Sequence, residues 1–231
     1  MIIPYNNYMC GIYCSNDLST FEVLEQANRE RGNFSTGIFY CYGKANYNVI
    51  KEEGVINWHA TNLPEGDNFL YLGHNQAPTE TGRDWKDETS HPFWWGDWIV
   101  AHNGVLTNFE DLIDEYLPMH DNPVDSSIIP ALLDEFEYSH GPCEDAETEV
   151  QNILYTIEKL RGTFALWIVN IKTMNVYIAR QGSTLFYKDA NVSSIKGDGY
   201  EEVKEGILYN YSYEGLTELD GFVYNSPFLT L

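Results

Sequence analysis

The chain has 231 residues, of which 43% are hydrophobic, so it is long enough to bury the core of one good-sized domain. Its 35 acidic and 13 basic residues give a formal net charge of −22, which argues against nucleic acid or an anionic membrane surface as a partner. The acidic residues are spread along the chain, so solubility explains them more simply than mimicry of an acidic polymer does.

The cysteines show neither a C-x-x-C pair nor the spacing of a zinc site; they are Cys10, Cys14, Cys41 and Cys143. A chain of this length does not need disulfides, so we expect reduced thiols and a cytoplasmic protein. No apolar run approaches the length of a membrane span. Residues 1–8 lack the basic start and the long apolar core of a secretory signal.

The first third of the chain predicts one helix among several strands. An apolar run over residues 9–14 indicates a buried strand. Ser19 and Glu22 have the spacing of a capping box, which predicts a helix over about 20–31 that ends at Gly32. A loop over 33–37 follows. Further strands are expected at 38–42, 47–50 and 69–72.

The polar segment 73–96 is expected to be a long loop, and its tryptophans indicate that it packs over something. The apolar run that starts at Trp98 has strand character and is expected to break in a turn at His102-Asn103-Gly104. Thr107 and Glu110 then have the spacing of a capping box. A strand that stops at Asn-Gly can aim a side-chain amide and a backbone N–H at one point, as an oxyanion requires. An ordinary tight turn is the alternative.

In the second half, a helix is expected to begin at Asp125 and a longer amphipathic helix to run over 147–161. A hairpin is predicted from strands at 163–171 and 175–179, and a short strand at 184–187. The last forty or so residues indicate strands and turns whose arrangement the sequence does not determine. Because the helices are grouped rather than strictly alternating with strands, the pattern favours an α+β layered fold over a doubly wound one.

Several short motifs follow one another between residues 9 and 186. They are Cys10-Gly11-Ile12, Arg31-Gly32 with Ser35 and Gly37-Ile38, Gly73-His74, Pro78-Thr79, Ser90-His91-Pro92, His102-Asn103-Gly104, Asp125-Ser126 and Leu160-Arg161-Gly162-Thr163-Phe164-Ala165-Leu166. Each is weak alone, but the ordered series resembles the class II glutamine amidotransferases, which are N-terminal-nucleophile (Ntn) hydrolases. The resemblance implies a four-layer αββα sandwich, with residues 1–9 as a leader or propeptide and 10–231 as a single domain.

The resemblance also implies catalytic roles. Cys10 would be the nucleophile that attacks the side-chain amide of glutamine, and its own free α-amine would be the general base. The side chain of Asn103 and the N–H of Gly104 would hold the oxyanion. Arg31 would support the loop of the nucleophile. The products would be glutamate and ammonia.

By the same resemblance, Asp125 matches the carboxylate that binds the substrate α-ammonium group. Gln76, Thr79 and His102 are the other expected substrate-binding residues. Taken without the resemblance, Cys10 is an ordinary buried thiol, Asp125 a helix N-cap and Arg31 the end of a helix. His74, His91 and His102 lack the close paired spacing of metal ligands, so we expect neither a metal nor a cofactor.

The chain departs from the family pattern in three places. Residues 1–9 precede Cys10, and while they are attached its nitrogen is an amide that cannot act as a base; removal of these residues, or a start at Met9, would free it. Gln76 replaces the arginine that normally holds the glutamine α-carboxylate, and it lacks that charge. Either Arg83 or another basic residue substitutes for that arginine, or the substrate lacks a free α-carboxylate, or no substrate binds. No acceptor domain follows the glutaminase-like region, so transfer of ammonia would require a separate synthase subunit.

These observations leave different functions open. The first is a glutaminase, or hydrolase of a related amide, that becomes active after residues 1–9 are removed. The second is a catalytically inactive Ntn-fold protein with a binding or structural role, which the leader and Gln76 favour. A third is an acidic decoy that binds a basic partner. The expected partners are glutamine or a related amide and a possible separate synthase subunit that receives ammonia, with neither nucleic acid nor a membrane.

Overall fold

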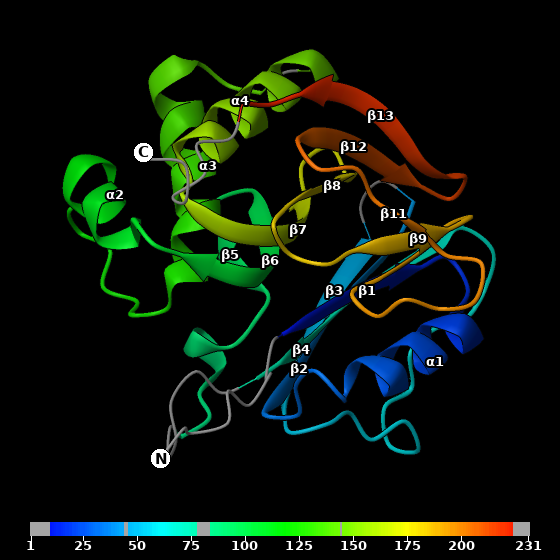
Figure 1. The fold of residues 1–231 in the computed structure, drawn as a ribbon. Helices are drawn as coiled ribbons and strands as arrows, with labels where there is room; N and C mark the ends of the chain where they lie inside the picture. Colours follow the sequence, from blue (N-terminus) through cyan, green and yellow to red (C-terminus); the bar gives the residue numbers. More distant parts are fainter. Residues whose placement is uncertain (1–9, 44–45, 78–83, 144, 224–231) are drawn as a thin grey trace, which may run out of the picture.

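The computed structural model describes residues 10–43, 46–77, 84–143 and 145–223. Its strands form two antiparallel sheets that stack on each other, here called sheet A and sheet B (Figure 1). Sheet A has the strand order β11-β9-β10-β1-β4-β2-β3 and sheet B the order β13-β12-β8-β7-β6-β5.

The strands of sheet A are β1 (Gly11–Ser15), β2 (Ser35–Tyr42), β3 (Asn46–Glu53), β4 (Phe69–Gln76), β9 (Phe186–Lys188), β10 (Asn191–Ser193) and β11 (Glu201–Glu202). Those of sheet B are β5 (Phe93–Trp95), β6 (Trp98–Leu106), β7 (Gly162–Asn170), β8 (Asn175–Gln181), β12 (Ile207–Ser212) and β13 (Gly215–Gly221). The helices are α1 (Leu18–Asn28), α2 (Phe109–Tyr116), α3 (Ile128–His140) and α4 (Ala146–Lys159), with short 3₁₀ helices η1 (Asp87–Thr89) and η2 (Asp125–Ser127).

Helix α1 covers the outer face of sheet A, and α3 and α4 cover the outer face of sheet B (Figure 1). The side chains of β1 show how the layers are packed, because successive residues of a strand point to opposite faces. Ile12 and Cys14 belong to the apolar cluster between the two sheets, whereas Tyr13 belongs to the cluster under α1. A third cluster joins sheet B to its helices. The predicted four-layer αββα sandwich of the α+β class is therefore confirmed.

The capping residue predicted for the first helix is wrong. The helix begins one residue before Ser19, and its N-cap is Asp17, whose carboxylate accepts the N–H of Thr20 at 2.7 Å. The same carboxylate accepts the hydroxyl of Ser19 at 2.8 Å, so the predicted capping residue is itself a donor to the cap. A carboxylate is a stronger acceptor than a hydroxyl at this position. The helix also ends earlier than predicted, at Asn28.

The turn predicted at His102-Asn103-Gly104 is also wrong, because β6 continues through these residues to Leu106. Their pairing with β7 is unbroken, with Asn103 opposite Ala165 and Gly104 opposite Phe164. The capping box predicted at Thr107 does not form, since its hydroxyl donates instead to the carbonyl oxygen of Arg161 at 3.3 Å. Helix α2 begins after Asn108 without a side-chain cap.

Other elements begin or end at different residues than predicted, because strand pairing extends beyond the local apolar pattern. The expected loop 33–37 contributes Ser35 to the start of β2, and the expected loop 73–96 contains the end of β4, η1 and β5. The predicted hairpin is confirmed as β7 and β8. The predicted strand near residue 184 begins at Phe186. The helix expected to begin at Asp125 is confirmed, with its first turn as η2 and the α-helix α3 following directly from Ile128.

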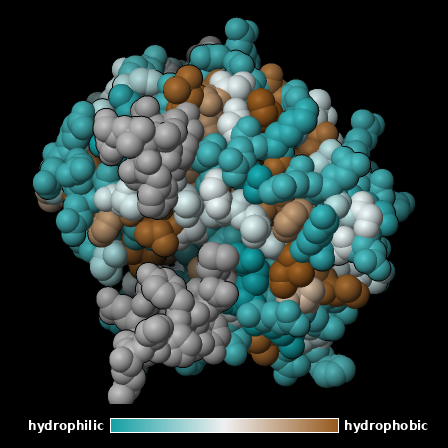
Figure 2. All heavy atoms as spheres, in the orientation of Figure 1, coloured by the Kyte–Doolittle hydropathy of each residue, from teal (hydrophilic) through white to brown (hydrophobic). Residues whose placement is uncertain are grey.

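Among the described residues, no helix combines the length and the apolar character that crossing a membrane requires. The face of the molecule in Figure 2 is mostly hydrophilic, with small and separate apolar patches. This surface agrees with the high acidic content of the chain.

Candidate active site

A cavity of about 530 Å³ opens where the ends of β1, β4 and β6 meet η2. It brings together several residues that the sequence predicts to be functional. Those that line it are Cys10, Gln76, His102, Gly104 and Asp125. Arg31 and Asn103 do not line the cavity. Arg31 donates to the carbonyl oxygen of Cys10, and Asn103 donates to Ser194 Oγ. Thr79 and Arg83 lie outside the residues that the structure describes.

Cys10 is half-buried and directly precedes β1. Its carbonyl oxygen accepts a hydrogen bond from Arg31 Nε at 2.8 Å. The same guanidinium donates to Thr184 Oγ1 at 3.2 Å and to the carbonyl oxygen of Ser194 at 3.4 Å. Arg31 therefore has a structural role beyond ending a helix, because its guanidinium connects the backbone of Cys10 to Thr184 and Ser194.

The thiol of Cys10 is protonated at neutral pH, because burial raises its pKa to about 11. The N–H of Ala77 lowers this pKa, the Asp125 carboxylate raises it further and the Arg31 guanidinium lowers it. Since the thiolate is the reactive form, the thiol needs a base that removes its proton during attack.

Asn103 and Gly104 lie side by side on β6. The amide nitrogen of Asn103 donates to Ser194 Oγ at 3.3 Å, and the same hydroxyl oxygen accepts the N–H of Ile12 at 3.0 Å. Ser194 thus joins β6 to β1 two residues after Cys10. No motif in the sequence indicated Ser194, which lies in a region whose arrangement could not be predicted.

Gly104 is required where β6 passes β7. A Cβ atom at this position would lie 2.0 Å from the carbonyl oxygen of Thr163, well inside van der Waals contact. Only glycine permits this approach while its backbone lines the cavity.

Asp125 is held by backbone groups at the cavity wall. One carboxylate oxygen accepts the N–H of Leu106 at 2.8 Å and the other accepts the N–H of Ser126 at 2.8 Å. These bonds orient the carboxylate and leave lone pairs on both oxygens for a cationic ligand. The Asp125 carboxylate therefore joins η2 to the end of β6. Its sequence position alone indicates only a helix N-cap.

The ring of His102 is neutral and fixed. Its Nε2 lies 3.1 Å from the carbonyl oxygen of Thr163, so Nε2 carries the proton, and Nδ1 accepts the Ser126 hydroxyl at 2.8 Å. Burial lowers the pKa of His102, although Asp125 opposes that shift. His102 is thus a supporting residue that orients Ser126 beside Asp125.

Gln76 is engaged within the protein. Its Oε1 accepts the hydroxyl of Ser35 at 2.9 Å, and its Nε2 donates to the carbonyl oxygen of Thr89 at 3.5 Å. Both ends of the amide therefore have protein partners. Among the described residues that line the cavity, the side chain with a formal positive charge is Lys86, which is exposed and which the sequence analysis did not single out.

The histidines near the cavity stack rather than converge on a point. The rings of His74 and His91 lie 3.9 Å apart, and His74 Nε2 donates to the carbonyl oxygen of His102 at 3.1 Å. Burial lowers the pKa of His74 to about 3, so this ring is neutral. Within the described part of the chain, no group of three His, Cys, Asp or Glu side chains is arranged to hold a metal ion.

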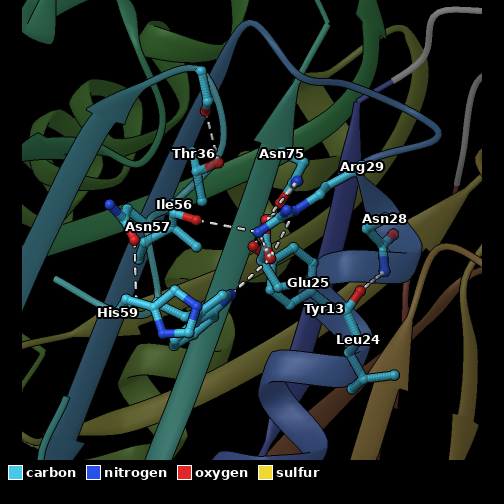
Figure 3. A network of polar contacts seen from close by, with 12 residues as sticks. Tyr13, Leu24, Glu25, Asn28, Arg29, Thr36, Ile56, Asn57, His59 and Asn75 are labelled. Carbon is cyan, nitrogen blue, oxygen red and sulfur yellow. Dashed lines mark hydrogen bonds and ion pairs between the residues drawn. The ribbon is translucent and has the colours of Figure 1, made fainter. Parts of the chain in front are cut away.

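A buried polar network joins α1 to sheet A (Figure 3). The fully buried carboxylate of Glu25 pairs with Arg29 at 2.7 Å and accepts the amide of Asn75 at 3.3 Å. Tyr13 donates its hydroxyl to Asn75. Because Tyr13 belongs to β1 and Asn75 to β4, the network fixes the relative position of the two strands that carry Cys10 and Gln76.

The fold resembles solved structures of glutamine amidotransferases. The glutamine phosphoribosylpyrophosphate amidotransferase from B. subtilis has a TM-score of 0.68 at 17% identity over 94% of this chain and 50% of that chain. A predicted glutamine amidotransferase from Pseudomonas aeruginosa has a TM-score of 0.52 at 16% identity over 91% of this chain and 96% of that chain. At these identities the likeness shows the fold alone.

No family model matches the chain. Curated relatives include the glutamine–fructose-6-phosphate aminotransferase (isomerizing) of Staphylococcus epidermidis, which is 30% identical over 191 residues. That alignment covers 77% of this chain but 30% of the relative, so the chain spans less than a third of the relative's length. Sequence and fold together show that the chain belongs to the class II glutamine amidotransferases, which have the Ntn-hydrolase fold.

Proposed function

We propose that the chain is a glutaminase domain that hydrolyses the side-chain amide of glutamine to glutamate and ammonia. The observation that carries this proposal is the single cavity in which Cys10 and Gly104 lie with Asp125. A nucleophile, an oxyanion donor and a carboxylate for an α-ammonium group are the parts that this reaction requires.

The reaction needs a base close to the Cys10 thiol, because burial keeps its pKa near 11. We propose that residues 1–9 are a leader and that the domain proper is 10–231, so that removal of the leader converts the nitrogen of Cys10 into a free amine. The amine takes the thiol proton, and the thiolate attacks the amide carbon. The ammonium group then returns a proton to the leaving nitrogen, which departs as ammonia. Water hydrolyses the resulting thioester to glutamate and free thiol.

The oxyanion of the tetrahedral intermediate would accept the N–H of Gly104 and one N–H of the Asn103 amide. The amide nitrogen of Asn103 carries two hydrogens, and one is used by Ser194 Oγ at 3.3 Å. The second is therefore available, while the bond to Ser194 holds the amide in place. Removing one such donor typically costs about a hundredfold to a thousandfold in kcat.

Substrate glutamine carries a positive and a negative group at its α-carbon. Asp125 lies in the cavity as the partner for the ammonium group. Because both ends of the Gln76 amide bind other protein groups, we propose that the Lys86 ammonium pairs with the α-carboxylate. His102 accepts the Ser126 hydroxyl, and the backbone N–H of Ser126 donates to the Asp125 carboxylate, so His102 and Ser126 together would keep Asp125 in position.

The ammonia would pass to a synthase domain or subunit. The relative from Staphylococcus epidermidis is about three times longer than its matching segment, and its name describes transfer to fructose 6-phosphate. For this chain we propose only an ammonia-consuming synthase and no particular acceptor.

A catalytically inactive Ntn-fold domain with a binding or structural role is the second candidate, and the replacement of arginine by Gln76 favours it. A glutamine analogue that carries a diazoketone in place of the amide separates the two candidates. When the analogue is incubated with the chain that starts at Cys10, one molecule should attach to Cys10 in each chain. Intact and peptide mass spectrometry detect this addition. The Cys14→Ala variant, a matched control on the same strand, should label fully. Absence of label from Cys10 would support the inactive alternative.

A further inference from the structure

A second hollow, separate from the catalytic cavity, lies between the open edges of the two sheets. Strands β3 and β5 end the strand orders of sheets A and B on the same side of the molecule. Val49 and Lys51 of β3 and Trp94 and Trp95 of β5 line a groove of about 500 Å³ between them. We call it the edge groove.

Two neighbouring tryptophans are half exposed at the edge groove. Trp94 is 50% exposed and Trp95 is 48% exposed. The Trp94 indole N–H donates to the carbonyl oxygen of Gly96 at 2.9 Å, and its ring packs edge-on against Tyr47 with centroids 5.9 Å apart. The Trp95 ring lies 5.8 Å from that of His120. Both rings are thus held by neighbours while about half of their surface remains open to a partner, as in the aromatic anchors of interfaces.

The charge around these rings is negative. Asp87, Glu88 and Asp121 line the edge groove, and its lysine, Lys51, is already paired with Asp87 at 3.7 Å. A smaller hollow that Trp95 also lines adds Asp134 and Glu135. Aromatic faces surrounded by carboxylates suit a guanidinium group, which can stack on a ring and pair with a carboxylate at once.

We propose that the edge groove is the docking surface for a protein partner whose contact segment presents arginine between apolar side chains. A second copy of this chain would bring the same carboxylates against themselves, so charge disfavours that occupant. A partner of opposite charge would bind through two favourable interactions. Its apolar side chains would cover the exposed indole rings, and its guanidinium groups would pair with the carboxylates. This proposal does not depend on catalysis by Cys10.

The edge groove and the catalytic cavity share a wall. Asp87 and Glu88 face the groove, whereas Thr89, in the same 3₁₀ helix, lines the cavity. The amide of Asn122 donates to the carbonyl oxygen of Glu88 at 2.6 Å and ties this helix to the segment that leads to Asp125. A docked partner would therefore rest on the outer side of the wall that encloses the substrate.

The test uses a peptide of four Arg-Leu repeats, titrated into the full chain at 150 mM NaCl and followed by calorimetry. We expect saturable binding with one site. The double variant Trp94→Ala/Trp95→Ala should weaken binding about tenfold with no change in net charge. The variant Asp87→Asn/Glu88→Gln/Asp121→Asn should weaken it at least as much. The matched variant Glu30→Gln/Glu65→Gln/Asp67→Asn, altered at exposed carboxylates outside the groove, should bind as the parent chain does.

Three results would overturn the proposal. The first is a parent chain that does not bind the peptide. The second is equal weakening in the two charge-neutralised variants, which would mean that binding is nonspecific attraction to an acidic surface. The third is a dimer in sedimentation velocity that the tryptophan variant dissociates, which would make a second copy the occupant. Circular dichroism of each variant distinguishes loss of the surface from loss of the fold, and Trp94→Phe/Trp95→Phe should restore most of the affinity.

Discussion

Arg31 holds the backbone of Cys10, with Nε 2.8 Å from the Cys10 carbonyl oxygen. This contact joins a residue three positions beyond the end of α1 to the residue that precedes β1. The other bonds of the guanidinium extend to Thr184 and Ser194, so one side chain connects segments that are far apart in the sequence. The position of the proposed nucleophile therefore depends on a cation that does not line the cavity.

Replacement of Arg31 by alanine should lower both stability and turnover. Loss of the donors leaves carbonyl oxygens in a partly buried setting, which costs about 1–3 kcal/mol of unfolding free energy. In the chain that starts at Cys10, kcat should fall at least tenfold, and Arg31→Lys should recover little because it lacks the planar fork. Urea unfolding and glutaminase assays measure the two effects. The exposed Arg161→Ala variant is the control, and an equal loss there would contradict the role given to Arg31.

Alkylation of Cys10 in the full chain should be slow and strongly dependent on pH. The pKa of about 11 means that the thiolate fraction, and hence the rate, rises about tenfold per pH unit from pH 7 to pH 10. Because the Asp125 carboxylate raises this pKa, Asp125→Asn should lower it and speed the reaction at pH 8. Iodoacetamide labelling with peptide mass spectrometry gives the rate at Cys10. A rate that is constant from pH 7 to pH 9 would show that the thiol is already ionised.

Lys86→Met should raise the KM for glutamine about tenfold, which corresponds to about 1.4 kcal/mol, with kcat nearly unchanged. The physical reason is loss of one charge that meets the α-carboxylate. The substrate 4-aminobutanamide, which lacks that carboxylate, should show no difference between parent and variant. Lys196→Met, at another exposed lysine, is the matched control. An unchanged KM for glutamine in Lys86→Met would remove Lys86 from the site.

Gly104→Ala should destabilise the fold, because its Cβ would lie 2.0 Å from the carbonyl oxygen of Thr163 and the paired strands would have to separate. We expect a loss of about 1–3 kcal/mol of unfolding free energy, as for overpacking elsewhere in protein cores. Gly66→Ala, where the nearest side-chain atom would be 3.5 Å away, should change stability little. Equal midpoints in urea for the two variants would contradict the close approach of β6 and β7.

The sequence predicted the layers of this fold better than the boundaries of its elements. Grouped helices and apolar runs were enough for an α+β layered fold, because burial patterns act over whole elements, whereas the four-layer sandwich was implied by the resemblance of the ordered motifs. They failed at His102-Asn103-Gly104, where pairing with β7 overrides the turn preference of Asn-Gly. They also failed at Ser19, because Asp17 offers a stronger cap.

The site could be predicted only through the ordered motifs. The structure places Cys10, Gly104 and Asp125 in one cavity although they come from distant parts of the chain. Ser194 and Lys86 were missed for a physical reason: their neighbours are determined by strand pairing and loop path, which no local pattern encodes. The roles of all these residues remain predictions for the experiments above.

Glutamate release by the chain that begins at Cys10 tests the central claim most directly. It should be measured beside the full chain and beside the same short chain with Cys10→Ala, with ammonia determined in parallel. The account predicts equal amounts of glutamate and ammonia from the short chain, with at least a thousandfold less from the other two. Equal activity in the Cys10→Ala chain, or no activity in a folded short chain whose Cys10 nitrogen is shown by mass to be free, would contradict it.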